Sequence, residues 1–144
     1  MTGAGAGEPR RAPDPGAASG RVTWSVDAES RLLVIVCRGG VTDDDLLAVI
    51  PGIWHERPEV ISYDSVVDAR DLTSEGGWTW PVLREIARRW HAFARGRDMG
   101  RRTAIVTTDT WIARLASVIA IDYQGRRMRC FGCPQLALTW LGRP

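Results

Sequence analysis

The chain has 144 residues and a formal net charge of +2, with 19 arginines against 17 acidic residues and with neither lysine nor asparagine. A domain of this length can bury a sizeable core, and the near-balanced charge excludes general nucleic-acid binding through a basic field. The missing lysine excludes P-loop phosphate binding and Schiff-base chemistry, and the missing asparagine excludes kinase-type metal binding.

The first 20 residues are rich in Gly, Ala and Pro and contain almost no large apolar side chain. Ordering them would cost conformational entropy that no burial offsets, so we expect residues 1–20 to be a disordered tail and residues 21–142 to form a single domain. Strands are predicted at 22–26 and 32–38, joined by a polar tetrad typical of a hairpin. The apolar run in the second strand is continuous, which predicts that both of its faces are covered.

The first helix is predicted from Asp43 to Glu56. Thr42 is a good N-cap residue, and the three aspartates that follow it complement the helix dipole. Pro51 falls inside this helix, where a proline costs about 3 kcal/mol. The sequence leaves open whether the helix is kinked there or split in two.

Strands and helices alternate along the rest of the chain. The predicted strands are 63–69, 103–107 and 127–131, and the predicted helices are 81–94, 110–123 and 134–141. The order ββαβαβαβα predicts an α/β fold with a mixed, mostly parallel five-stranded sheet, an N-terminal hairpin and about four helices. The longest apolar run is far shorter than the roughly 20 residues of a membrane-spanning helix, so no transmembrane segment is predicted.

Three segments carry the most characteristic pattern of the chain: SYDSVVDARDLTS, RRTAIVTTDTWIARL and RMRCFGCPQLALTWL. Together they resemble the SpoIIAA-like family, which combines the sulfate-transporter and anti-sigma-antagonist (STAS) fold with kinship to CRAL-TRIO lipid carriers. The match covers residues 22–142. It implies a compact mixed sheet with helices, no catalysis in most members, and a module that binds proteins or apolar ligands, so we expect neither catalytic residues nor a cofactor.

The loops that follow the predicted parallel strands hold the candidate site. In an open α/β sheet, ligands bind outside the carboxyl ends of the strands, and indoles there suit an apolar ligand. We expect an apolar small molecule or lipid to contact three tryptophans, while a serine, a threonine and an aspartate orient its polar head. The predicted site residues are Ser74, Trp78, Trp80, Thr108, Asp109 and Trp111.

The resemblance also implies a second use of Ser74. Anti-sigma antagonists carry a phosphorylatable serine just after the third strand, in an Asp-Ser-Ser-Gly context; Ser74 is the nearest match, and the paired serines are missing. A phosphate would add about −1.5 to −2 charges at a helix entrance, where free N–H groups favour an anion. The alternative hypothesis is a protein-interaction module that is switched at Ser74 and binds a regulatory protein. The wide apolar arc of the helix at 110–123 also fits simple burial or a homodimer interface.

The three cysteines, Cys37, Cys130 and Cys133, are too few for a secreted disulfide framework, and no signal-like apolar segment stands near the N-terminus, so a cytoplasmic location is expected. Cys130 and Cys133 form a C-x-x-C at a strand-to-helix junction, where a helix N-terminus lowers the pKa of a thiol. Thiol redox chemistry is therefore a remote alternative. No metal site is expected, because this motif supplies two zinc ligands and His55 and His91 lie on different helices.

Overall fold

The computed structural model describes residues 10–11, 21–73, 78–123 and 125–144, in which six strands form one sheet in the order β1-β2-β3-β4-β5-β6. β2 is antiparallel to both of its neighbours, whereas β3 to β6 are parallel. The strands are β1 (Arg10–Arg11), β2 (Arg21–Asp27), β3 (Leu32–Gly39), β4 (Asp64–Leu72), β5 (Arg102–Val106) and β6 (Arg127–Phe131).

The five predicted strands are thus confirmed, and the two-residue strand β1 adds a sixth within the expected tail. The rest of that tail, residues 1–9 and 12–20, lies outside the described residues. β4 continues to Leu72, beyond the predicted end at Ala69, because its last residues Asp71 and Leu72 still pair with β3.

Four α-helices occur in the described part of the chain: α1 (Asp43–Glu56), α2 (Trp80–Ala94), α3 (Thr110–Ile119) and α4 (Pro134–Trp140). α1 begins with a capping box, in which the Thr42 hydroxyl accepts from the Asp45 N–H and the Asp45 carboxylate accepts from the Thr42 N–H. α1 runs through the buried Pro51 as one helix, so it is not split.

Two 3₁₀ helices complete the secondary structure of the described residues, η1 (Pro58–Ser62) and η2 (Ala120–Asp122). The predicted third helix, 110–123, was too long as an α-helix, because its last turn tightens into η2.

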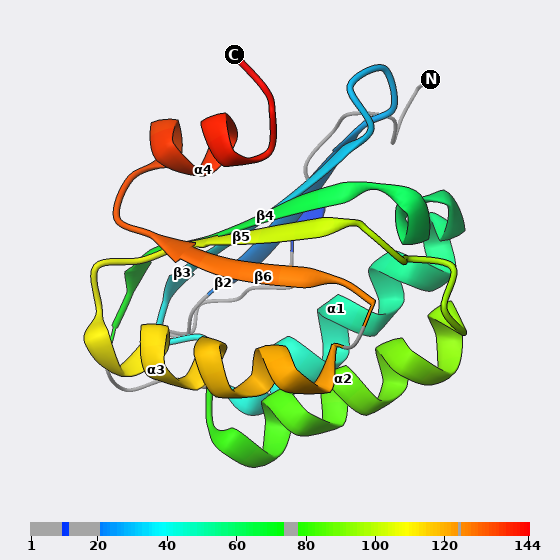
Figure 1. Cartoon of the computed structure of the whole chain (residues 1–144). Helices are drawn as coiled ribbons and strands as arrows, with labels where there is room; N and C mark the ends of the chain where they lie inside the picture. Colours follow the sequence, from blue (N-terminus) through cyan, green and yellow to red (C-terminus); the bar gives the residue numbers. More distant parts are fainter. Residues whose placement is uncertain (1–9, 12–20, 74–77, 124) are drawn as a thin grey trace.

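The helices form two layers of unequal size. α1, α2 and α3 cover one face of the sheet, and the short helix α4 lies on the other (Figure 1). On β3 the residues that face the larger layer, Leu33, Ile35 and Cys37, are buried, whereas Leu32, Val34 and Val36 are partly buried. The prediction that both faces of this strand are covered was wrong in part, because α4 has only seven residues and packs on β5 and β6.

The core is divided in the same way. The larger part lies between the sheet and α1, α2 and α3, and it includes Trp54 and Trp90, whose ring centroids are 4.8 Å apart in an edge-to-face arrangement. The smaller part lies under α4 and includes Val106 and Leu141. In the ranges that the structure describes, no helix is long and apolar enough to cross a membrane.

Candidate functional site

A cavity of about 120 Å³ lies between the sheet and the larger helix layer. The sheet forms one wall of the cavity, and every second residue of the central strands lines this wall because alternate side chains point to the same face. These sheet residues are Leu33 and Ile35 of β3, Ser65 and Val67 of β4, Thr103 and Ile105 of β5, and Met128 of β6. The wall that the sheet forms is therefore apolar apart from two hydroxyl groups.

The opposite wall of the cavity consists of helix residues spaced three or four apart, a spacing that places them on one face of each helix. They are Leu46, Ile50 and Trp54 of α1, Leu83, Ile86 and Trp90 of α2, and Ala116 and Ile119 of α3. Ala116 is the smallest side chain among the described lining residues. Its size leaves space that a leucine would fill.

Arg126 closes the cavity at the amino ends of β4 and β5, and only 6% of its surface is exposed. Its terminal nitrogens donate to Thr103 Oγ1 at 3.0 Å and to the carbonyl oxygens of Ile61 and Tyr63 at 3.1 and 3.0 Å. Its Nε lies 3.4 Å from Asp98 Oδ2. Burial lowers the pKa of the Arg126 guanidinium, and the buried Asp98 carboxylate opposes this shift and balances the charge.

The polar groups around Arg126 also bind one another. Trp90 Nε1 donates to Asp98 Oδ2 at 2.7 Å, and the hydroxyl groups of Ser65 and Thr103 are 2.8 Å apart. Tyr123 also lines this end, where burial raises the pKa of its phenol and the nearby Arg126 charge acts in the opposite direction. This end of the cavity is a connected polar network.

Trp78 lines the cavity from the loop between β4 and α2. It is 7% exposed, and its Nε1 is buried without a hydrogen-bond partner in the portion of the chain that the structure describes. Its backbone has φ of 67°, in the left-handed region that bulky residues seldom adopt. The next residue, Thr79, donates to Asp43 Oδ2 at 2.7 Å and so ties the start of α2 to the start of α1.

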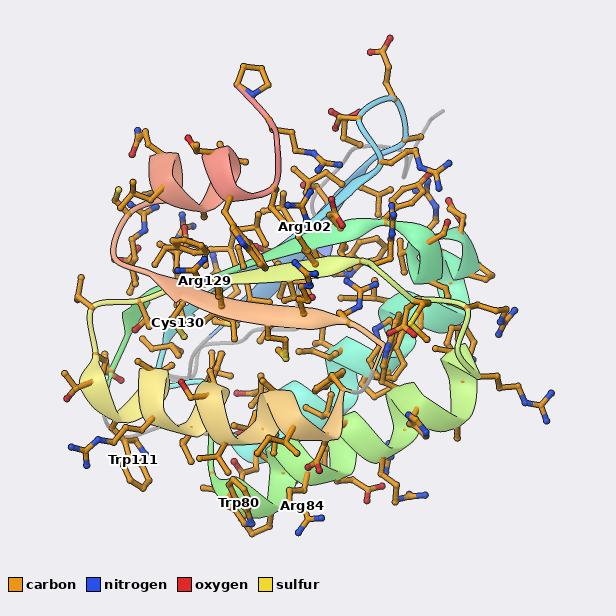
Figure 2. The ribbon with its side chains drawn as sticks, viewed as in Figure 1. Trp80, Arg84, Arg102, Trp111, Arg129 and Cys130 are labelled. Atoms are coloured by element: carbon orange, nitrogen blue, oxygen red, sulfur yellow. The ribbon has the colours of Figure 1, made fainter. Side chains whose placement is uncertain are left out.

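The structure does not gather the other predicted site residues around Trp78. Trp80 is 38% exposed and Trp111 is 61% exposed, and both lie on the side of the helix layer that faces away from the sheet (Figure 2). Thr108 is exposed, and Asp109 serves as the N-cap of α3 by accepting from the Trp111 N–H at 2.8 Å.

Two further predictions from the sequence concern the roles of Ser74 and the position of the ligand site at the edge of the sheet. Ser74 belongs to residues 74–77, which lie outside the described residues, so its proposed roles stay predictions. The order of the described strands has no reversal, so these strands form no switch-point crevice, which is where ligands bind in doubly wound sheets. The cavity lies beneath the sheet instead.

Sequence reasoning missed Arg126, Asp98 and Trp90. The sequence contains 19 arginines, and nothing in the local pattern distinguishes the buried Arg126 from the exposed ones. The available signal was weak: Asp98 lies eight residues after Trp90, just beyond the end of α2, within reach of a buried indole N–H.

Burial weakens the acidity of two of the three cysteines. All three are free; burial raises the pKa of Cys37 to about 12 and also raises the pKa of Cys130. A redox C-x-x-C requires a thiolate near neutral pH, so the raised pKa of Cys130 disfavours that chemistry. Within the described ranges, no three His, Cys, Asp or Glu side chains come together as a metal-binding group.

Comparison with solved structures finds a similar chain in an uncharacterized protein of the DUF3478 family from Shewanella loihica PV-4, which has a SpoIIAA-like fold. The two chains are 14% identical, the match covers 90% of this chain and 99% of the other, and the TM-score is 0.59. No protein-family model and no curated protein matches the sequence. The likeness shows the fold alone, and it confirms the SpoIIAA-like α/β architecture that the sequence resemblance implied.

Proposed function

We propose that the chain is a non-catalytic module that binds an apolar small molecule, or the end of a lipid tail, in the cavity beneath the sheet. The observation that carries this proposal is a cavity of about 120 Å³ with mostly apolar walls inside the main core. Natural cores are close-packed, with few voids larger than a water molecule. An apolar cavity of about 150 Å³ stays dry and accepts benzene, so a ligand of about that size fits here.

The volume also decides between a small molecule and a whole lipid. Sites for drug-sized ligands usually measure about 300–1,000 Å³, well above the volume of this cavity. A complete acyl chain would therefore require the helix layer to move away from the sheet. A small ring, or only the last carbons of a tail, fits the cavity as it stands.

Substitution of Ala116 by leucine tests the proposal, because the added carbons fill the cavity from α3. Benzene serves as the probe, and its binding is measured as a rise in the thermal unfolding midpoint, since a ligand that binds only the folded state stabilises it. We expect benzene to raise the midpoint of the wild type but not that of Ala116→Leu. Ala92→Leu is the matched control because Ala92 is exposed on the outer side of α2. No benzene effect on the wild type, or an equal effect on Ala116→Leu, contradicts the proposal.

Solvent extraction of the purified protein followed by mass spectrometry separates the two kinds of ligand. A co-purified molecule about the size of one ring supports the small-molecule form of the proposal. A co-purified fatty acid or phospholipid supports the lipid form of the proposal.

A regulatory protein-interaction module is the second candidate. Three apolar side chains on α3 and η2 favour it: Trp111, Val118 and Ile121 are 61%, 47% and 75% exposed. Large exposed indoles are typical anchors of protein interfaces. A second copy of this chain is the simplest partner to test: sedimentation should show a dimer that Trp111→Ser dissociates, whereas a monomer would leave a different regulatory protein as the partner. A switch at Ser74 belongs to this second candidate, and the free cysteines fit a cytoplasmic location for either one.

A further inference from the structure

The Trp78 indole N–H is a buried donor without an acceptor in the described ranges, and Trp78 is one of the residues that line the cavity. Trp78 is 7% exposed, and no group in the described ranges accepts a hydrogen bond from its Nε1. Buried donors in native proteins nearly always have a partner, so an exception calls for an explanation. Because Trp78 lines the cavity, a molecule inside the cavity can supply the missing acceptor.

The backbone of Trp78 is unfavourable as well. A φ of 67° is a left-handed conformation that is strained for a bulky residue. Among the described residues, the other non-glycine residues with positive φ are Arg31 and Arg95, both exposed, at the β2–β3 turn and at the C-cap of α2. Trp78 alone of the three is strained and buried, and such strain is typical of ligand sites.

The charges around the cavity limit what the ligand can be. Arg126 is the one cation among the described lining residues, and the Asp98 carboxylate already balances it. Its terminal nitrogens are bound to the Thr103 hydroxyl and to carbonyl oxygens. A carboxylate or phosphate inside the cavity would therefore be buried without a free counter-charge, which is strongly unfavourable. The walls thus favour a neutral ligand.

We propose that the cavity takes a neutral, ring-sized molecule with one hydrogen-bond acceptor, such as a heteroaromatic nitrogen or a carbonyl oxygen, and that Trp78 Nε1 donates to this acceptor. The inference rests on the proposed function and specifies its ligand class. The apolar side chains contact the ring, and Trp78 fixes its orientation.

Benzene and pyridine test the inference because they have nearly the same shape and only pyridine carries an acceptor. Both are titrated at neutral pH, where pyridine is uncharged, into the wild type and Trp78→Phe. The dissociation constant of pyridine relative to benzene is compared between the two proteins, so that the stronger hydration of pyridine cancels. We expect the dissociation constant of pyridine divided by that of benzene to be about tenfold lower in the wild type than in Trp78→Phe. The variant removes the indole donor but keeps an aromatic ring.

The indole N–H signals in a ¹H–¹⁵N correlation spectrum provide a second measurement that requires no variant to bind ligand. The Trp78 signal is the one missing from Trp78→Phe, and pyridine should shift it much further downfield than benzene does. If both probes bind and neither the ratio nor this signal distinguishes them, the inference is overturned while the proposed function stands. If neither probe binds the wild type, both are overturned.

Discussion

Two buried tryptophans line the same cavity, but among the described residues only one of them has a hydrogen-bond partner for its indole N–H. Trp90 is 6% exposed and its Nε1 donates to the Asp98 carboxylate at 2.7 Å, whereas Trp78 is 7% exposed and its Nε1 has no partner in the described ranges. Burial is therefore equal, and the difference lies in the hydrogen bond. An indole N–H that is satisfied within the protein stabilises the fold, whereas an unsatisfied one lowers stability until something binds it.

The two ends of the cavity differ in how many contacts join their polar groups, although Arg126 Nε, like Trp78 Nε1, has no hydrogen-bond partner in the described ranges. At the Arg126 end, the cation, the Asp98 carboxylate and the Thr103 hydroxyl are joined by contacts from several elements of the fold. At the other end, Trp78 offers one free donor from a strained backbone position. We interpret the Arg126 end as a structural element and the Trp78 end as the ligand-recognition element.

The largest expected effect is the loss of Asp98. Asp98→Ala leaves the Arg126 guanidinium buried without a counter-charge and removes the acceptor of Trp90 Nε1. Breaking a buried ion pair from one side typically costs about 3–5 kcal/mol, so we expect the free energy of unfolding to fall by roughly that amount. Urea denaturation followed by circular dichroism measures the change.

Glu85→Ala is the control for the removal of an acidic side chain. Glu85 pairs with Arg88 and Arg89 on the outer surface of α2, where water screens the charges, so its loss should change stability far less. The double variant Asp98→Ala/Arg126→Met should be more stable than Asp98→Ala alone, because it removes the unpaired charge. An Asp98→Ala protein as stable as Glu85→Ala would show that the Arg126 end does not hold the fold together.

The second-largest expected effect is a difference in stability between two variants that carry the same substitution, Trp→Phe, at different sites. Trp90→Phe and Trp78→Phe both shorten a buried aromatic side chain, but only Trp90→Phe breaks a hydrogen bond to a carboxylate. Such a bond contributes about 1.5–3 kcal/mol, so Trp90→Phe should be the less stable variant by about that amount in urea denaturation without ligand. Equal losses at the two sites would mean that Trp78 Nε1 has a partner in the protein, and the comparison would fail.

The framework of the fold could be predicted from sequence because its signals are local. Short apolar, β-branched runs bounded by turn residues predicted the five longer strands, and Thr42 with the three aspartates after it predicted the start of α1. Pro51 gave an ambiguous signal, because the packing of α1 against the sheet and α2 decides whether a proline can be accommodated. Burial on the far side of the sheet was overestimated, because the size of α4 rather than the strand composition determines it.

The candidate site could be predicted only in part. Trp78 was expected in a ligand site and lines the cavity, whereas Trp80 and Trp111 are too exposed to line it. Sequence spacing places residues on an element but does not show which of two neighbouring tryptophans turns inward. Arg126 donates to Thr103, 23 positions away, and to Ile61, 65 positions away, and no local pattern encodes contacts at that separation.

The smallest expected effect is the pH dependence that Tyr123 contributes at the Arg126 end. Burial raises the pKa of Tyr123 above that of an unfolded tyrosine, which is about 10. Below that pH both states keep the proton and the stabilisation is complete; above it the unfolded chain loses the proton first, so stability falls as the pH rises, by at most about 1.4 kcal/mol per pH unit. Urea denaturation at increasing alkaline pH should show a shallower fall for Tyr123→Phe than for the wild type.

Cys37, whose pKa burial raises to about 12, contributes a slope of the same sign to both proteins and cancels in their difference. Trp78→Phe removes no titrating group and should keep the wild-type slope, so a slope that changes in Trp78→Phe but not in Tyr123→Phe would reverse the assignment of the two ends.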